Sequence, residues 1–385
     1  MKMKQLLILS LVFVSLVGCS EISSNNTVHQ MCLPVETDKS LIQLEDGLIL
    51  TGGEDTYILN QKTGLQTRIP LSQNGDYYVD VSNFLVTPNY EKAAYIVTYY
   101  QSINGSLSYL DQSLMVLLGG KKEIKVTDWR PGIEKPIEWF DNDRLLISPI
   151  NYSDGTVLLL NPLTNERSEF RPSFSDIYNL DPIPWYESAN PLPVYNRSMS
   201  HVFYLRNSMK GMEFVLKNQT TGDVVWSKVV HNPVNKPEWS SIDDKVMLAI
   251  SPNSPSDFEF YSIDQHGQEA NLSSFSSFYR STYIDGFKLS PNGINIGFWL
   301  DGRDDKDEYN PRFAILDLSN RQTTDYCIGQ GGGSIFWSPS GNQVALKVID
   351  MYNANSWYTV VLDIQKNIAV KIANSEYPVG WVLTK

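Results

Sequence analysis

The feature that most restricts the fold of this chain is a short hairpin motif that occurs twice in its last hundred residues. Residues 287–299 read Phe-Lys-Leu-Ser-Pro-Asn-Gly-Ile-Asn-Ile-Gly-Phe-Trp, and residues 336–348 read Phe-Trp-Ser-Pro-Ser-Gly-Asn-Gln-Val-Ala-Leu-Lys-Val. In both, Pro presets φ for a turn, Gly supplies a positive φ, and apolar residues alternate on either side. A hairpin that recurs after about 50 residues indicates a repeat architecture.

Aromatic residues extend this repeat over the rest of the chain. Seven of them open successive units at spacings of 44 to 56 residues: Phe84, Trp139, Tyr195, Trp239, Phe287, Trp337 and Trp381. Each unit holds about four short strand-like runs, and no long helical pattern interrupts them. We therefore predict an all-β fold, a seven-bladed β-propeller of four-stranded antiparallel blades. Six or eight blades would also fit, because residues 172–193 are irregular.

The two ends of the predicted domain, residues 41–385, complement each other. Residues 378–384 form an opening strand that no blade follows, whereas residues 41–72 lack the aromatic residue of an opening strand. We expect the C-terminal strand to complete the first blade. That pairing closes the ring and leaves no free sheet edge, which would otherwise invite aggregation.

The N-terminus has the organisation of a secretory signal. Two lysines lie within residues 1–5, and residues 6–17 form an apolar run that is too short to span a bilayer as a permanent helix. Residues 16–19, Leu-Val-Gly-Cys, closely resemble the bacterial lipobox. The resemblance implies cleavage between Gly18 and Cys19 and acylation of Cys19, so that residues 1–18 are the signal peptide. The alternative is an ordinary signal peptide with an incidental cysteine.

A lipidated Cys19 predicts a protein of the cell envelope that is tied to a membrane outside the cytoplasm. Residue 20 is Ser rather than Asp, and by resemblance to the usual sorting pattern this implies the outer membrane if the host has two membranes. In a host with one membrane, the protein would sit on the outer face of the plasma membrane. Residues 19–40 are mostly polar, and we expect a lipidated N-terminus followed by a flexible tether.

Charge and cysteine content restrict the partners. The full chain carries a net charge of −12, and loss of residues 1–18 leaves 29 basic against 43 acidic groups. Such a surface repels phosphate backbones, so we expect no nucleic-acid partner.

Cys32 and Cys327 either bridge in an oxidising compartment or remain two buried thiols. We expect no cofactor, because the sequence contains no C-x-x-C and its four histidines are widely separated.

Several residues are candidates for binding. Five carboxylates lie within residues 301–308, and Asp301, Asp304, Asp305 and Asp307 could hold Ca²⁺, although a solvated hairpin tip is the simpler interpretation. Trp129, Trp185 and Tyr186 fall in Pro-containing connections, where aromatic side chains either contact a protein or glycan or cap the sheet ends. Turn carboxylates such as Asp141 and Asp243 could do acid–base work on a sugar, but they more often cap their own turns. We predict no catalytic residue.

The units at residues 289–298 and 337–346 resemble the WD40-like repeat found in TolB and in the propeller domains of prolyl oligopeptidases. Residues 239–248 are a weaker copy. TolB's N-terminal α/β domain and the peptidases' G-x-S-x-G elbow are absent, so the peptidase activity does not transfer. The resemblance implies a propeller that contacts other molecules through its faces. We therefore expect a membrane-anchored platform for protein binding or assembly, with a glycan-binding or glycan-processing surface protein as the alternative.

Overall fold

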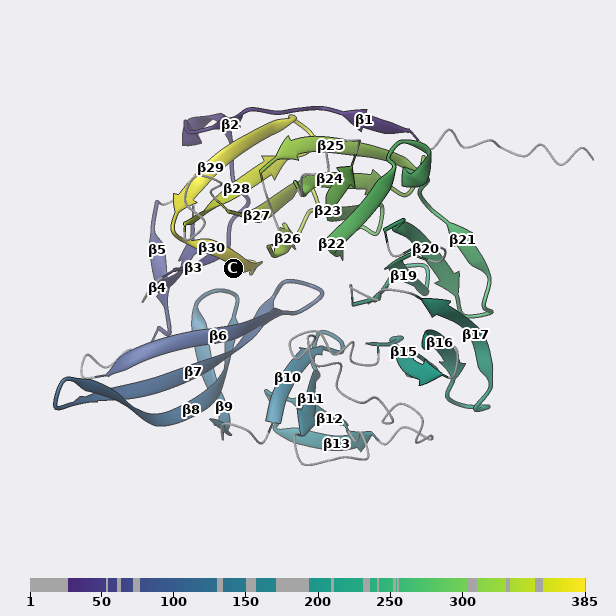
Figure 1. The fold of residues 1–385 in the computed structure, drawn as a ribbon. Coiled ribbons are helices and arrows are strands. Elements are labelled where there is room, and N and C mark those ends of the chain that lie inside the picture. The colour runs from purple at the N-terminus through teal and green to yellow at the C-terminus, as the bar shows by residue number, and fades with distance from the viewer. Residues whose placement is uncertain are drawn as a thin grey trace, which may run out of the picture.

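The chain forms a closed ring of seven four-stranded antiparallel blades, which confirms the predicted seven-bladed β-propeller (Figure 1). The computed structural model describes residues 27–52, 55–60, 64–71, 77–129, 134–149, 157–170, 194–208, 211–230, 236–240, 242–251, 254, 256–303, 310–329, 333–349 and 356–384. Apart from the short 3₁₀ turns η1 (Lys39–Leu41) and η2 (Phe275–Ser277), the regular elements in these ranges are strands.

The blades follow one another along the chain, and only the first takes a strand from the far end. Blade 1 consists of β30 (Tyr377–Trp381), β3 (Leu48–Gly52), β4 (Asp55–Leu59) and β5 (Gln66–Ile69). Blade 2 consists of β6 (Tyr78–Val86), β7 (Lys92–Ile103), β8 (Ser106–Leu118) and β9 (Lys122–Trp129). Blade 3 consists of β10 (Glu134–Trp139), β11 (Leu145–Pro149), β12 (Val157–Asn161) and β13 (Glu166–Phe170). Blade 4 consists of β14 (Val194–Tyr195), β15 (His201–Ser208), β16 (Gly211–Asn218) and β17 (Val224–Val230). Blade 5 consists of β18 (Glu238–Trp239), β19 (Lys245–Ile250), β20 (Glu259–Asp264) and β21 (Glu269–Asn271). Blade 6 consists of β22 (Ser281–Leu289), β23 (Asn295–Arg303), β24 (Arg312–Asp317) and β25 (Gln322–Ile328). Blade 7 consists of β26 (Ile335–Trp337), β27 (Gln343–Ile349), β28 (Trp357–Asp363) and β29 (Ile368–Asn374).

All seven predicted aromatic anchors lie on the first strand of a blade, and the first strands of most neighbouring blades contact each other around the ring axis. Three of the tryptophans also donate their indole N–H to the preceding blade. Trp139 Nε1 lies 2.7 Å from the carbonyl oxygen of Leu85, and Trp337 Nε1 lies 2.9 Å from that of Lys288. The anchors therefore hold consecutive blades together by apolar packing and by a directional hydrogen bond.

The turn after the first strand has the same hydrogen bonds in several blades, including those with weak sequence motifs. In blades 2, 4, 6 and 7 a side-chain oxygen, from Thr87, Asn196, Ser290 or Ser338, accepts the backbone N–H five residues later. Three residues after that side chain, the backbone is left-handed, with Gly in the two strong motifs and Tyr90 (φ 60°) and Met199 (φ 56°) in the weak ones. The hydrogen bond to the side chain holds the turn in place, so that a residue other than Gly can occupy the left-handed position that Gly normally favours.

The C-terminal strand closes the ring, as predicted. Strand β30 pairs antiparallel with β3, with Trp381 opposite Leu48 and Tyr377 opposite Thr51. Beyond the strand, the backbone N–H of Val382 donates to the carbonyl oxygen of Gly47 over 2.9 Å. Trp381 is buried between blades 7 and 1, where it packs with residues of both. The two ends of the domain thus form a single sheet.

Residues 27–41 include two strands and a 3₁₀ turn, so the flexible tether expected for residues 19–40 needs correction in this part. Strand β1 (Val28–Gln30) adds in parallel to the outer edge of blade 6, and β2 (Val35–Glu36) adds in parallel to the outer edge of blade 7. Outer strands offer unpaired backbone groups, and an extended segment can satisfy them. Residues 27–44, here called the N-terminal arm, therefore lie along two blades (Figure 1). Residues 19–26 lie outside the described ranges.

A disulfide fastens the arm to blade 6. Cys32 and Cys327 are bonded, with their Cα atoms 4.7 Å apart and a sequence separation of 295. Backbone hydrogen bonds continue on both sides of the bond, from Met31 N–H to the oxygen of Asp325 and from Leu33 N–H to that of Tyr326. Of the two alternatives open in the sequence, the structure contains the bridged pair.

Candidate functional site

Two surfaces depart from the regular propeller, and the first is a hairpin that projects from blade 2. Strands β7 and β8 have 12 and 13 residues, longer than any other strand in the described ranges. Strand β6 begins opposite Tyr100 and β9 ends opposite Gln112. Residues 101–108 therefore pair only with each other, and their tip extends beyond the ring at the left of Figure 1.

One face of this hairpin carries a row of aromatic and aliphatic side chains. Tyr78 pairs with Tyr100, Tyr100 pairs with Tyr109, and Leu107 lies two residues further on the same face. The ring centres of Tyr78 and Tyr100 are 5.9 Å apart, and those of Tyr100 and Tyr109 are 6.4 Å apart. Leu107 is 57% exposed and Tyr109 is 44% exposed. We call these four residues the tyrosine face.

The hairpin is nearly free of charge in a strongly acidic chain. Residues 99–112 read Tyr-Tyr-Gln-Ser-Ile-Asn-Gly-Ser-Leu-Ser-Tyr-Leu-Asp-Gln, in which Asp111 is the single charged residue. A surface built from Tyr, Ser, Asn, Gly and exposed aliphatic residues resembles the composition of protein-binding loops.

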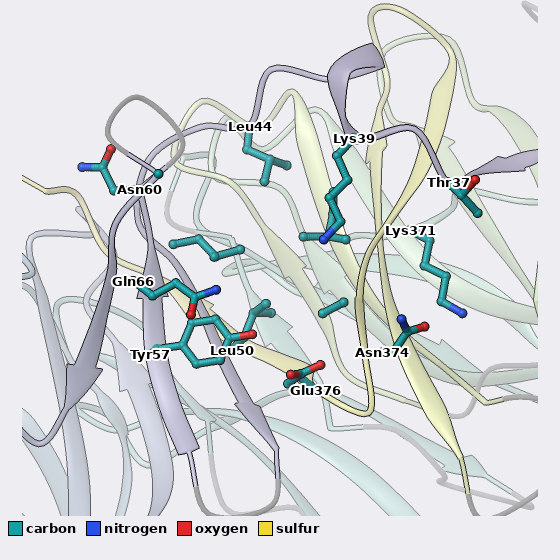
Figure 2. A pocket seen from close by; sticks show the side chains of 14 residues that line it. Thr37, Lys39, Leu44, Leu50, Tyr57, Asn60, Gln66, Lys371, Asn374 and Glu376 are labelled. Atoms are coloured by element: carbon teal, nitrogen blue, oxygen red, sulfur yellow. The ribbon is translucent and has the colours of Figure 1, made fainter.

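The second surface is a cleft of about 710 Å³ between blades 7 and 1, at the seam where the ring closes (Figure 2). Blade 1 contributes its floor and one wall through Leu50, Tyr57, Leu59 and Gln66. Blade 7 contributes residues 371–374 of β29, and the N-terminal arm covers the cleft with Thr37, Lys39 and Leu44. The size is within the roughly 300–1,000 Å³ that ligand sites in proteins usually have.

Opposite charges enter the cleft from different elements. Figure 2 shows the side chain of Lys39 pointing into it from the arm, with Glu376 and the hydroxyl of Tyr57 on the other side. Burial, together with the negative charges of Glu376 and Asp55, raises the pKa of Tyr57 to about 12, so that its hydroxyl stays protonated and can donate. Lys371 stands at the rim with its ammonium 4.3 Å from the ring centre of Tyr358.

The predicted calcium ligands are only partly described. Asp301 lies in β23 and is 2% exposed, and its carboxylate pairs with Arg303 Nε at 2.8 Å and accepts the backbone N–H of Asn310 at 3.1 Å. Asp304, Asp305 and Asp307 fall outside the described ranges. Within the part of the chain that the structure describes, no three His, Cys, Asp or Glu side chains gather in a way that could hold a metal ion.

The turn carboxylates brace the fold. Asp141 accepts the backbone N–H of Asp143 and of Arg144 and pairs with the Arg144 guanidinium. Burial alone would raise the pKa of Asp141, but these hydrogen bonds and the Arg144 charge more than offset it and hold the pKa below its usual value. Asp244 accepts the indole N–H of Trp239 at 2.6 Å. These contacts agree with the capping interpretation.

Of the three aromatic contact candidates, the structure describes only the backbone of Trp129. Trp129 is the last residue of β9, where its backbone lies opposite Gln112 at the base of the projecting hairpin. Trp185 and Tyr186 lie outside the described ranges, as do Gly18 and Cys19.

The tyrosine face and the cleft were not predicted from the sequence. The hairpin had a usable signal, because Asn104-Gly105 is a strong two-residue turn between two unusually long strand-like runs.

No helix within the described residues is both long enough and apolar enough to cross a membrane. No protein-family model matches the chain, and no curated protein matches it in sequence.

The fold defines the chain as a closed seven-bladed β-propeller, and it resembles several solved structures over most of its length. The oligogalacturonate lyase of Vibrio parahaemolyticus is 10% identical and superposes with a TM-score of 0.50, over 86% of this chain and 87% of the lyase. TolB from Acinetobacter baumannii is 13% identical over 89% of this chain and 81% of its own, with a TM-score of 0.43. The propeller domain of the Trilobed protease from Pyrococcus furiosus, which has an open velcro topology, is 11% identical over 77% and 85%, with a TM-score of 0.48. At such identities the likeness to the lyase shows a shared fold and nothing about activity.

Proposed function

We propose that this protein is a lipid-anchored, extracytoplasmic propeller that binds another protein of the cell envelope through the hairpin of blade 2. The observation that carries the proposal is the tyrosine face, an exposed and almost uncharged surface on an otherwise strongly acidic molecule. Protein interfaces are enriched in aromatic residues at their centre and depleted of charge there. Rigid Tyr side chains also supply contact area at a low cost in conformational entropy.

The attachment of the N-terminal arm supports an orientation for the anchored protein. Val28 lies beside Thr323, at the start of β25, and β1 runs in the same direction as β25. Second and fourth strands of antiparallel blades run the same way, so the tip after β7 lies on the side of the ring opposite to the side where the arm begins. Residue 27 lies eight positions after Cys19, a reach of at most about 28 Å. An anchored ring would thus hold the hairpin away from the membrane.

Acylation of Cys19 is tested by changing it to Ser and separating membranes from soluble material. Two or three acyl chains bind firmly, since each buried methylene contributes about 0.8 kcal/mol. We expect the Cys19→Ser protein to leave the membrane fraction. Retention of this variant at the wild-type level would refute the anchor and would leave the hairpin proposal standing.

The binding surface is tested with the double variant Leu107→Ser/Tyr109→Ser, purified from detergent-solubilised membranes. Both side chains are exposed, so the fold should be retained, and loss of two central apolar contacts should weaken binding at least tenfold. The matched control is Leu163→Ser, because Leu163 is 46% exposed in a turn of blade 3. A stoichiometric partner that copurifies with the wild type and the control but not with the double variant supports the proposal. Equal recovery by all three proteins would contradict it, as would binding of a glycan and no protein.

A further inference from the structure

The cleft between blades 7 and 1 differs in chemistry from the tyrosine face and is separate from it. It combines an apolar floor, formed by Leu50 and its neighbours, with charged groups at its margins. The chain as a whole is acidic, with a net charge of −12, yet two of the three charged residues that line the cleft are lysines. A ligand that enters it therefore meets positive charge on the arm side and negative charge at Glu376.

The edge of blade 7 adds a second feature. Strand β2 pairs with β29 only through Val35 and Glu36, which lie opposite Ala369 and Val370. Strand β29 continues to Asn374, and its residues 371–374 line the cleft. The outer edge of β29 thus runs on into the cleft beyond the point where the added strand ends. Extended polypeptides commonly bind at such an edge through main-chain hydrogen bonds.

We propose that this cleft binds a short peptide with free termini, whose carboxylate pairs with Lys39 and whose ammonium group pairs with Glu376. The backbone of the peptide would lie along residues 371–374 of β29, and its side chains would rest on the apolar floor. Gln66 supplies an amide that can donate to or accept from the peptide backbone. This complementarity of charge and backbone selects a peptide over an apolar ligand or a simple anion.

The arm makes the site dependent on the N-terminal segment. Lys39 belongs to η1, which follows β2 directly, and Asp38 begins this turn by accepting the N–H of Ser40 at 2.9 Å. Because β2 and the bond between Cys32 and Cys327 hold the arm in place, the same contacts that fasten the arm also position the ammonium group of Lys39.

Isothermal titration calorimetry tests the proposal with tripeptides that carry Gly, Leu, Lys or Glu in the middle position. Each is used with free termini, with an acetylated N-terminus, and with an amidated C-terminus. We expect at least one free tripeptide to bind the wild-type protein, and either modification to weaken binding about tenfold or more, because each removes a charge-assisted hydrogen bond. Absence of binding by every free peptide, or equal binding of modified and free forms, would overturn the proposal.

Two variants test which side chain binds each terminus of the peptide. Lys39→Gln should bind free and amidated peptides equally, and Glu376→Gln should bind free and acetylated peptides equally. Lys121→Gln, at an exposed turn of blade 2, is the control and should behave as the wild type does. Variants that keep the wild-type preference for both free termini would place the peptide elsewhere and refute the site. Leu107→Ser/Tyr109→Ser should leave peptide binding unchanged, so the outcome is independent of the proposal for the hairpin.

Discussion

Closure of the ring at Gly47 can be tested by a single methyl group. Gly47 has φ +96°, and a Cβ added there would lie 1.6 Å from the carbonyl oxygen of Val382, in the segment that follows the closing strand. Because the obstacle is a backbone atom, no side-chain rotation relieves the overlap. Gly47→Ala must therefore displace residues of the C-terminal segment from the first blade.

The expected loss of stability can be compared with a matched substitution. Gly105, at the hairpin tip, has φ +81°, and a Cβ there would meet nothing within 4 Å. Gly105→Ala should cost only the left-handed backbone penalty of about 1–2 kcal/mol. Gly47→Ala adds the loss of the 2.9 Å hydrogen bond that the backbone N–H of Val382 donates to the carbonyl oxygen of residue 47. Each buried polar group left unpaired costs about 1–3 kcal/mol, and the lost bond leaves two such groups, so we expect a total of about 3–8 kcal/mol.

Urea denaturation of the two variants measures this difference, and hydrogen exchange locates it. An additional loss of about 3 kcal/mol corresponds to a melting temperature about 4 °C lower for a domain of this length. Amides of β3 and β30 should exchange faster in Gly47→Ala, whereas those of β19 and β20, on the far side of the ring, should change little. Equal stabilities for the two variants, or faster exchange spread evenly over all blades, would refute closure by the C-terminal strand.

Three further predictions concern contacts between parts of the ring. Trp139→Phe should lower the free energy of unfolding in urea by about 1–2 kcal/mol, because the partly buried carbonyl of Leu85 loses its donor. Reduction of the bond between Cys32 and Cys327 should lower the free energy of unfolding in urea, by up to about 6 kcal/mol in the chain-entropy picture for a separation of 295 residues, and an unchanged free energy of unfolding would argue against a fastened arm. Burial raises the pKa of Tyr326 to about 12, above the ordinary value of 10, so its contribution is complete below pH 10 and is lost as pH rises toward 12. Urea titrations at pH 9 to 11 should therefore show a smaller decline for Tyr326→Phe than for the wild type.

The repeat was predictable because its signal is local. The aromatic anchors and the turn after each first strand recur at a regular spacing, and the anchors contact the neighbouring blade. The weak copies were harder to recognise, since residues such as Tyr90 and Met199 occupy a left-handed position that the strong motifs give to Gly. In those blades the side chain of Thr87 or Asn196 accepts a backbone N–H and so fixes the turn, and a search for Gly cannot find it.

The arm and the cleft could not be predicted because they depend on the assembled ring. A polar segment such as residues 27–40 has no periodic pattern, and it becomes two short strands only where blades 6 and 7 offer free outer edges. The cleft likewise combines residues from the two ends of the chain, such as Lys39 and Glu376, which no local pattern relates. The tyrosine face needed the register of β7 and β8, since the irregularity after Tyr99 determines which side chains share a face.

The most direct test of the proposed function is photo-crosslinking in intact cells. A photoreactive amino acid would replace Leu107 on the tyrosine face or, as a matched position, Leu163 on the turn of blade 3. We predict a discrete crosslinked product with one envelope protein from position 107 and none from position 163, with both proteins recovered in the membrane fraction. Crosslinking to the same protein from both positions, or to no protein from position 107, would contradict the account.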